Sequence, residues 1–127
     1  MLTGPALLRS CLLVVSFLFA PVALAEPLVL SVTSAEAMED QVTGDPIIFF
    51  SMAEESAAAF GRLTTENVDR TVEIRLDGVT VSAPVIREPI LRGTVVIYGD
   101  FDHTDVVDLA ARIASGDVTV EVEVVDP

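Results

Sequence analysis

Residues 76–90 read LDGVTVSAPVIREPI, and this stretch decides the fold because it contains a hairpin turn and the loop that follows it. Asp77-Gly78 predicts a type I′ turn, which needs a positive φ at both central positions. The residues on either side, Thr71 to Leu76 and Val79 to Ser82, alternate in polarity as two paired strands do. Pro84 and Pro89 cannot donate ladder hydrogen bonds, so we expect an edge or a bridging loop after the hairpin.

Towards the N-terminus, the sequence predicts two strands and a helix. The first strand is Leu28 to Thr33, and the polar, acidic stretch from Ser34 to Gly44 is expected to be a loop, with or without one helical turn. The second strand is the apolar run from Pro46 to Phe50, which ends at Ser51. Ser51 and Glu54 have the spacing of a capping box, which predicts a helix that runs to about Val68. Its apolar face would be formed by Ala53, Ala57, Phe60 and Leu63.

Towards the C-terminus, the sequence predicts a strand, a helix and a last strand. Gly93 frees the backbone before the strand Thr94 to Tyr98. Asp102 with Asp105 predicts a helix start, because acidic groups in a first turn interact favourably with the helix dipole. Gly116 is a typical C-terminal stop. The helix face would comprise Val106, Leu109, Ala110 and Ile113, and the last strand would bury Val118, Val120, Val122 and Val124.

These elements predict an α+β fold with the order β-β-α-β-β-β-α-β. Two amphipathic helices packed on one face of a mostly antiparallel sheet would bury both apolar surfaces. The sequence contains no internal repeat and no long linker. We therefore expect residues 26–127 to form one domain.

The first 25 residues have the pattern of a secretory signal peptide. Arg9 precedes an apolar run, and Ala23-Leu24-Ala25 forms an A-x-A cleavage site. We expect cleavage after Ala25, no membrane span after that cleavage, and a periplasmic or, alternatively, a secreted location. The only cysteine, Cys11, would leave with the signal peptide, so no disulfide would support the mature domain.

The charge balance limits the partners that this chain can have. Twenty acidic residues face seven arginines and no lysine, for a formal net charge of −13. Such a surface repels nucleic acid and anionic lipids and keeps an exported domain soluble. It would also attract basic segments of partner chains. We expect no nucleic-acid partner.

Several motifs in order resemble those of the P1 head subdomain of SecD, a subunit of the SecDF accessory translocase. The resemblance covers about residues 44–117 and rests on the strand from Ile47 to Phe50, a helix with Phe60, Thr64, Thr65 and Asn67, the Leu76-Asp77-Gly78 hairpin, Ser82-Ala83-Pro84, Glu88-Pro89-Ile90, Asp108-Leu109-Ala110 and Gly116. It implies an α+β head that handles polypeptide during export and is not an enzyme.

The sequence also departs from that family pattern. Gly116-Asp117-Val118-Thr119 stands where relatives have Gly-Ala-Leu-Pro, and Gly99-Asp100-Phe101-Asp102 stands where they have Gly-Asn-Phe-Thr. The membrane spans and the embedded acidic residues of SecD, implied in proton coupling, have no counterpart here. We therefore expect polypeptide binding without proton-driven motion, or another use of the head scaffold.

The loop after the hairpin is the candidate binding site. A loop stiffened by two prolines loses little entropy when it binds, and a neighbouring edge strand could accept an extended chain. The candidate residues are Pro84, Val85, Ile86, Pro89, Ile90 and Leu91. The alternative is that these side chains cap the core beneath the sheet.

Other kinds of site have weaker support. The acidic residues around His103, namely Asp100, Asp102, Asp105 and Asp108, lack the periodic ligands of an EF-hand, so we expect no metal. His103 is the only histidine, and its position in an acidic first turn does not favour catalysis. No Gly-rich phosphate loop or paired-cysteine motif is present, and we expect no cofactor.

The expected function is therefore an exported, non-enzymatic module that binds extended or unfolded polypeptide and assists protein export or folding in the periplasm. The alternative is an adaptor that docks one folded envelope partner, such as a translocase complex.

Overall fold

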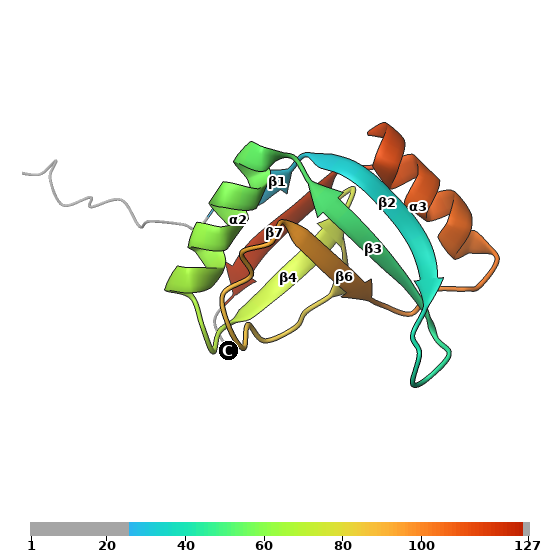
Figure 1. Cartoon of the computed structure of the whole chain (residues 1–127), viewed down its shortest axis with the longest axis horizontal. Helices are drawn as coiled ribbons and strands as arrows, with labels where there is room; N and C mark the ends of the chain where they lie inside the picture. The colour runs from blue at the N-terminus through green and yellow to red at the C-terminus, as the bar shows by residue number, and fades with distance from the viewer. Residues whose placement is uncertain (1–25, 126–127) are drawn as a thin grey trace, which may run out of the picture.

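A computed structural model describes residues 26–125 of the chain (Figure 1). The predicted signal peptide, residues 1–25, lies outside the described residues. Within the described range, no helix is both long and apolar enough to cross a membrane. The elements in chain order are β1 Leu28–Leu30, β2 Val32–Glu39, β3 Pro46–Met52, α2 Glu54–Glu66, β4 Thr71–Leu76, β5 Val79–Ser82, β6 Thr94–Tyr98, α3 Asp105–Ser115 and β7 Val120–Val125.

The strands form two antiparallel sheets. The large sheet has the order β1-β7-β4-β5 and the small sheet the order β2-β3-β6. The chain passes from the large sheet to the small one at Ser31, a single residue between β1 and β2. Helix α3 packs against β2 and β3, whereas α2 packs against β1 and β3. The two helices lie at opposite ends of the molecule in Figure 1.

The inner faces of both sheets and one side of each helix share a single hydrophobic core. The alternation of each strand points every second side chain into this core. The small sheet contributes Ile48, Phe50 and Ile97, and the large sheet contributes Val72, Ile74, Val120 and Val122, all of them at most 3% exposed. The helices add Phe60 from α2, and Val106, Ala110 and Ile113 from α3.

The predicted α+β class and the order of elements are confirmed, with the first predicted strand divided into β1 and β2. The hairpin is confirmed as well: β4 pairs with β5, and φ is 50° at Asp77 and 84° at Gly78. The Asp77 carboxylate accepts a hydrogen bond from the Thr119 amide at 2.8 Å. Gly116 ends α3 with a φ of 88°.

The prediction of a loop from Ser34 to Gly44 was wrong for its first half. Strand β2 continues to Glu39 and pairs with β3 along its length. The stretch alternates, with Ala35 and Ala37 packed against the core and Glu36 and Met38 exposed. Alanine is only weakly apolar, so the alternation of Ala35 and Ala37 with Glu36 does not give the strong apolar–polar pattern of a typical strand. The sequence therefore indicated a polar loop.

The predicted capping box at Ser51 was also wrong. Ser51 belongs to β3, where it pairs with Ser34 and Thr94, and α2 begins at Glu54 with Ala53 as its N-cap residue. Ala53 makes no side-chain cap hydrogen bond. The helix ends at Glu66, before the predicted Val68. Pairing on both sides of β3 fixes Ser51 in the sheet, which a local capping pattern cannot show.

Candidate binding surface

The first half of the candidate loop is attached to the start of β4. The Val72 amide donates to the Pro84 carbonyl at 2.9 Å, and the Ile86 amide donates to the Arg70 carbonyl at 2.8 Å. A further bond runs from the Asp69 amide to the Ile86 carbonyl at 2.7 Å. The loop therefore continues the large sheet beyond β5 as irregular edge pairing, although Pro84 itself donates nothing.

The second half of the loop is held on α2 by a buried hydroxyl. The Ile90 amide donates to Thr64 Oγ1 at 2.9 Å, and the Thr64 side chain is fully buried. The same hydroxyl lies 2.9 Å from the Phe60 carbonyl and 3.1 Å from the Gly61 carbonyl, where it donates back to the helix. The Thr64 hydroxyl thus gives the Ile90 amide a hydrogen-bond acceptor inside the protein.

Gly61 lets the loop approach the helix closely. A Cβ at this position would lie 3.3 Å from Leu91 Cδ2 and 3.6 Å from the Ile90 carbonyl oxygen. Glycine in a helix interior costs about 0.5–1 kcal/mol relative to alanine. Because Gly61 has no side chain, Leu91 can lie directly against α2.

The structure separates the six candidate residues into two groups. Ile86 is 3% exposed and belongs to the core, and Ile90 is half-buried and packs against it. Pro84 and Pro89 are exposed, Val85 is 37% exposed and Leu91 is 70% exposed. The core-capping alternative therefore describes Ile86 and, in part, Ile90, while the other four residues are exposed.

Leu91 stands between two shallow hollows. One, of about 480 Å³, runs along α2 and is lined by small and amphipathic residues that include Ala57, Ala58 and Gly61. The other, of about 440 Å³, is lined by the loop itself from Glu88 to Arg92 and by Thr94. Leu91 borders both hollows, so its exposed apolar side chain separates them.

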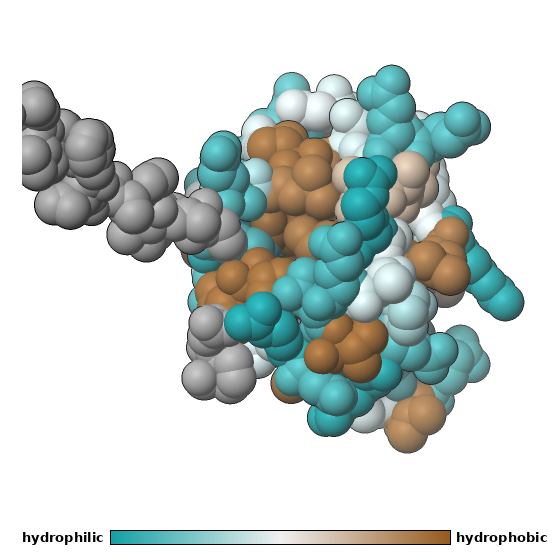
Figure 2. All heavy atoms as spheres, turned by 90° about the vertical axis from the view of Figure 1, so that its left-hand side faces the viewer, coloured by the Kyte–Doolittle hydropathy of each residue, from teal (hydrophilic) through white to brown (hydrophobic). Residues whose placement is uncertain are grey.

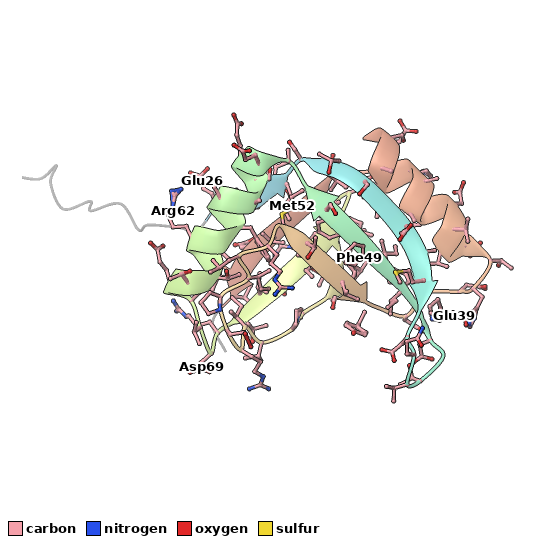
Figure 3. The ribbon with its side chains drawn as sticks, viewed as in Figure 1. Glu26, Glu39, Phe49, Met52, Arg62 and Asp69 are labelled. Atoms are coloured by element: carbon pink, nitrogen blue, oxygen red, sulfur yellow. The ribbon has the colours of Figure 1, made fainter. Side chains whose placement is uncertain are left out.

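A third hollow, of about 440 Å³, lies at the other side of α2. Its lining includes Glu26, Leu28, Arg62, Arg70 and Val124, and Glu26 and Arg62 lie at the outer side of the helix in Figure 3. Figure 2 shows this side of the molecule, where hydrophobic surface is interrupted by hydrophilic side chains. Arg62 borders this hollow and the one beside Leu91.

The charge of the candidate loop differs from that of the chain as a whole. Between Ala83 and Gly93, the loop carries Arg87 and Arg92 against the single acid Glu88. The excess of acid that would attract basic partners is therefore located elsewhere on the molecule.

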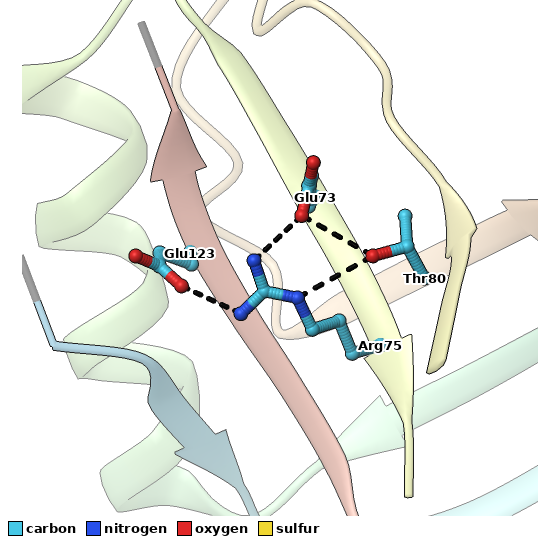
Figure 4. Close-up of polar contacts among 4 residues, drawn as sticks. All are labelled: Glu73, Arg75, Thr80 and Glu123. Atoms are coloured by element: carbon cyan, nitrogen blue, oxygen red, sulfur yellow. Dashed lines mark hydrogen bonds and ion pairs between the residues drawn. The ribbon is translucent and has the colours of Figure 1, made fainter. Parts of the chain in front are cut away.

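The outer face of the large sheet holds a network of ion pairs (Figure 4). Arg75 donates to Glu123 at 2.5 Å and to Glu73 at 2.6 Å, and Thr80 donates to the same Glu73 oxygen at 3.2 Å. The hydrogen bond from Arg75 lowers the pKa of Glu73, and the bond to Glu123 raises the pKa of Arg75. These groups are hydrogen-bonded to one another across three strands.

The acidic cluster around His103 stabilises a helix start. The Asp102 carboxylate accepts the Thr104 amide at 2.9 Å and the Thr104 hydroxyl at 2.8 Å, which lowers the Asp102 pKa. His103 is exposed, and its Nε2 lies 3.3 Å from the Gly44 carbonyl and 3.9 Å from Glu39. Within residues 26–125, no group of three or more His, Cys, Asp or Glu side chains could hold a metal ion.

Reasoning from the sequence alone did not assign a loop-positioning role to Thr64 or Gly61. The sequence signal that could have indicated this contact is Gly61, because a glycine in the interior of a helix usually has a packing reason. Thr64 appeared only as part of a family resemblance, because nothing local shows that a threonine hydroxyl meets an amide 26 residues later.

Comparison with known proteins agrees with this fold. A family model described as SecDF, P1 head subdomain matches residues 24–120. The protein translocase subunit SecD of Dictyoglomus turgidum is 40% identical over 93 residues, which are 73% of this chain and 23% of that protein. The chain thus spans about a quarter of the length of this curated relative.

Two solved structures are similar over most of the chain. A crystal structure of SecDF in a super-membrane-facing form has a TM-score of 0.64 and 31% identity, and the match covers 76% of this chain and 13% of that one. A structure of SecDF, described as a membrane component that enhances protein export, has a TM-score of 0.55 and 34% identity, and covers 66% of this chain and 36% of that one. The chain belongs to the SecDF P1 head subdomain family.

Proposed function

We propose that this chain is exported to the periplasm and binds extended or unfolded polypeptide there, without catalysis, in support of protein translocation. The observation that carries the proposal is the family match over residues 24–120. Its relatives are named as protein translocase subunits. The predicted signal peptide, residues 1–25, and a single mature domain, residues 26–127, are part of the same proposal.

The geometry of the loop supports polypeptide binding. Its backbone is held at one end by β4 and at the other by Thr64, so the exposed Val85 and Leu91 are presented by a preordered segment. A preordered surface loses less conformational entropy when a partner binds. The binding residues of this proposal are Pro84, Val85, Pro89 and Leu91, with Ile86 and Ile90 as their anchors in the core.

The walls of the hollows beside Leu91 favour a partner without a fixed sequence. A specific small-molecule site combines an enclosed apolar cavity with a few convergent polar groups. Here the hollows are shallow and are lined by Ala57, Ala58, Gly61 and loop residues. Such walls accept varied apolar side chains.

The test is capture of a reduced, unfolded client by the purified protein. A Val85→Ser/Leu91→Ser variant should bind such a client at least fivefold more weakly than the unchanged chain. Val68→Ser/Val107→Ser is the matched control, because these residues are 37% and 63% exposed, close to the 37% and 70% of Val85 and Leu91. Equal binding by the loop variant and the control would overturn the role of the loop.

A second candidate function is docking to one folded envelope partner. The relatives are subunits of an assembly, which favours this alternative as well. Crosslinking in envelope fractions separates the two functions. Many products of different mass support the binding of unfolded clients, whereas one stoichiometric product supports docking. Ile86 is not a suitable position for these variants, because a charge there would be buried in the core.

A further inference from the structure

The two sheets present very different outer surfaces. On the large sheet, the residues that point away from the core include the Glu73–Arg75–Glu123 network. On the small sheet, the corresponding positions are mostly apolar: Met38, Ile47, Phe49, Val96 and Tyr98. We call these five residues the outer face of the small sheet. Phe49 lies near the middle of β3 in Figure 3.

Strand register places these five side chains together. Met38 and Tyr98 both pair with Ile47, and Val96 pairs with Phe49. Side chains at directly paired positions of an antiparallel sheet lie about 4.5–5.5 Å apart at Cβ. Their neighbours on the same strands, Ile48, Phe50 and Ile97, point the opposite way into the core.

This face is apolar but is not part of the core. Ile47 is 7% exposed and lies outside the core cluster, and its partners in the strand register are Met38 and Tyr98. Met38 and Tyr98 themselves are 43% and 57% exposed. Phe49 and Val96 are half-buried, so the apolar surface continues between these two exposed residues. An apolar patch of this kind marks an interaction surface more often than scattered single residues do.

The charges around this face define its partner. Residues 26–61 and 93–111 contain no lysine or arginine, and these two segments supply all three strands of the small sheet and the turns that join them to α3. Glu36 pairs with Phe49 and lies on the same side of the small sheet as these five residues. The strand ends and turns beside Met38 and Tyr98 add Glu39, Asp40, Asp45 and Asp100. The nearest arginine in sequence, Arg92, precedes β6 at the other end.

We propose that the outer face of the small sheet binds a polypeptide segment that carries basic side chains beside apolar ones. The apolar side chains would cover Met38, Phe49 and Tyr98, and the basic ones would lie near Glu36 and the acidic turns. A second copy of this chain is disfavoured as the occupant, because it would bring the same acidic groups together. This surface is separate from the loop, so the inference shares only the class of partner with the proposed function.

Tyr98 makes the proposal directly measurable. The chain has one tyrosine and no tryptophan, so tyrosine emission reports on this face alone. The probe is a ten-residue peptide of alternating lysine and leucine, with a glutamate–leucine peptide as its charge-reversed control. We expect the lysine–leucine peptide to change the Tyr98 emission, and the glutamate–leucine peptide to leave it unchanged.

Affinities are then compared by the anisotropy of the labelled peptide. Met38→Thr/Tyr98→Thr should weaken lysine–leucine binding at least fivefold, whereas Val29→Thr/Val79→Thr, with 57% and 65% exposed residues on the large sheet, should leave it unchanged. Glu36→Lys should weaken the same binding and allow the glutamate–leucine peptide to bind. Glu55→Lys, on the exposed side of α2, is the matched charge control.

Three results would overturn the inference. The first is equal peptide binding by the face variant and its control, with both variants melting within a few degrees of the unchanged protein. The second is loss of peptide binding in Val85→Ser/Leu91→Ser alone, which would leave the proposed function standing and remove this face. The third is a dimer in light scattering that Met38→Thr/Tyr98→Thr abolishes, because the occupant would then be a second copy.

Discussion

At the scale of single residues, Arg75 lets two glutamates stay charged side by side on the outer face of the large sheet. Its guanidinium donates to Glu73 and Glu123 from different nitrogens, so each carboxylate faces a positive group. The Arg75 hydrogen bond is the largest cause of the lowered Glu73 pKa, and partial burial opposes it. The charged form of Glu73 is therefore favoured in the folded protein.

Glu73→Gln should remove a stabilising contribution that depends on pH. Because the folded-state pKa is lowered, the contribution is fully present above the ordinary glutamate pKa of about 4.3 and is lost as the pH falls through the folded value. The melting temperature of the variant should be lower than that of the unchanged protein at pH 7, and the difference should shrink between about pH 5 and pH 3. Thermal melts in steps of half a pH unit measure it.

Glu88→Gln controls for the loss of one surface carboxylate away from Arg75. A Glu73→Gln difference that stayed constant, or grew, as the pH fell to 3 would contradict the ion-pair account.

At the scale of elements, the loop and α2 behave as one unit because a single buried hydroxyl joins them. Thr64→Val keeps the side-chain shape and removes the oxygen, which leaves the Ile90 amide without its partner. An unsatisfied buried amide costs about 1–3 kcal/mol, so we expect a loss of that size in the free energy of unfolding. Urea denaturation measures this loss, and the loop amides at Ile90 and Leu91 should also exchange their hydrogens faster.

Thr65→Val is the matched control on the neighbouring position. Thr65 is an exposed residue whose hydroxyl donates to the Gly61 carbonyl at 2.7 Å in a partly buried hydrogen bond, so water can reach this carbonyl more easily than it reaches Thr64. If both variants lost the same stability and neither changed the loop amides, Thr64 would not be the anchor.

The sequence predicted the elements whose conformation follows from their own residues. It did not predict those whose conformation depends on pairing with other strands. The turn at Asp77-Gly78 follows from those two residues alone. Helix α3 follows from the helical spacing of its valines and isoleucine, and Gly116 ends it. In contrast, β2 is a strand because β3 pairs with it, and Ser51 stays in β3 because β2 and β6 pair on both sides. The candidate loop was found, but its division into anchors and exposed residues depends on Thr64 and Gly61, which lie far away in sequence.

At the scale of the whole molecule, the charge balance acts on the stability of the fold. Residues 26–127 carry all twenty acidic residues and six of the seven arginines, which is a strong excess of negative charge for a small domain. Self-repulsion of this kind destabilises the compact state. The arginines are not spread evenly, since none precedes Arg62 in the described residues or lies between Arg92 and Arg112, so the repulsion concentrates around the small sheet.

Added salt should therefore stabilise this protein at neutral pH. The Debye length falls from about 30 Å at 0.01 M to about 8 Å at 0.15 M ionic strength, which screens repulsion among the turns at Asp40, Asp45 and Asp100. The half-buried Arg75 pairs are screened less than fully exposed charges, so they offset only part of the gain. The melting temperature at pH 7 should rise across this range of sodium chloride. At pH 3, below the ordinary aspartate and glutamate pKa values of about 3.9 and 4.3, the same salt should produce a much smaller rise. A melting temperature that fell with salt at pH 7 would mean that attractive pairs, and not acidic repulsion, dominate the electrostatics of this fold.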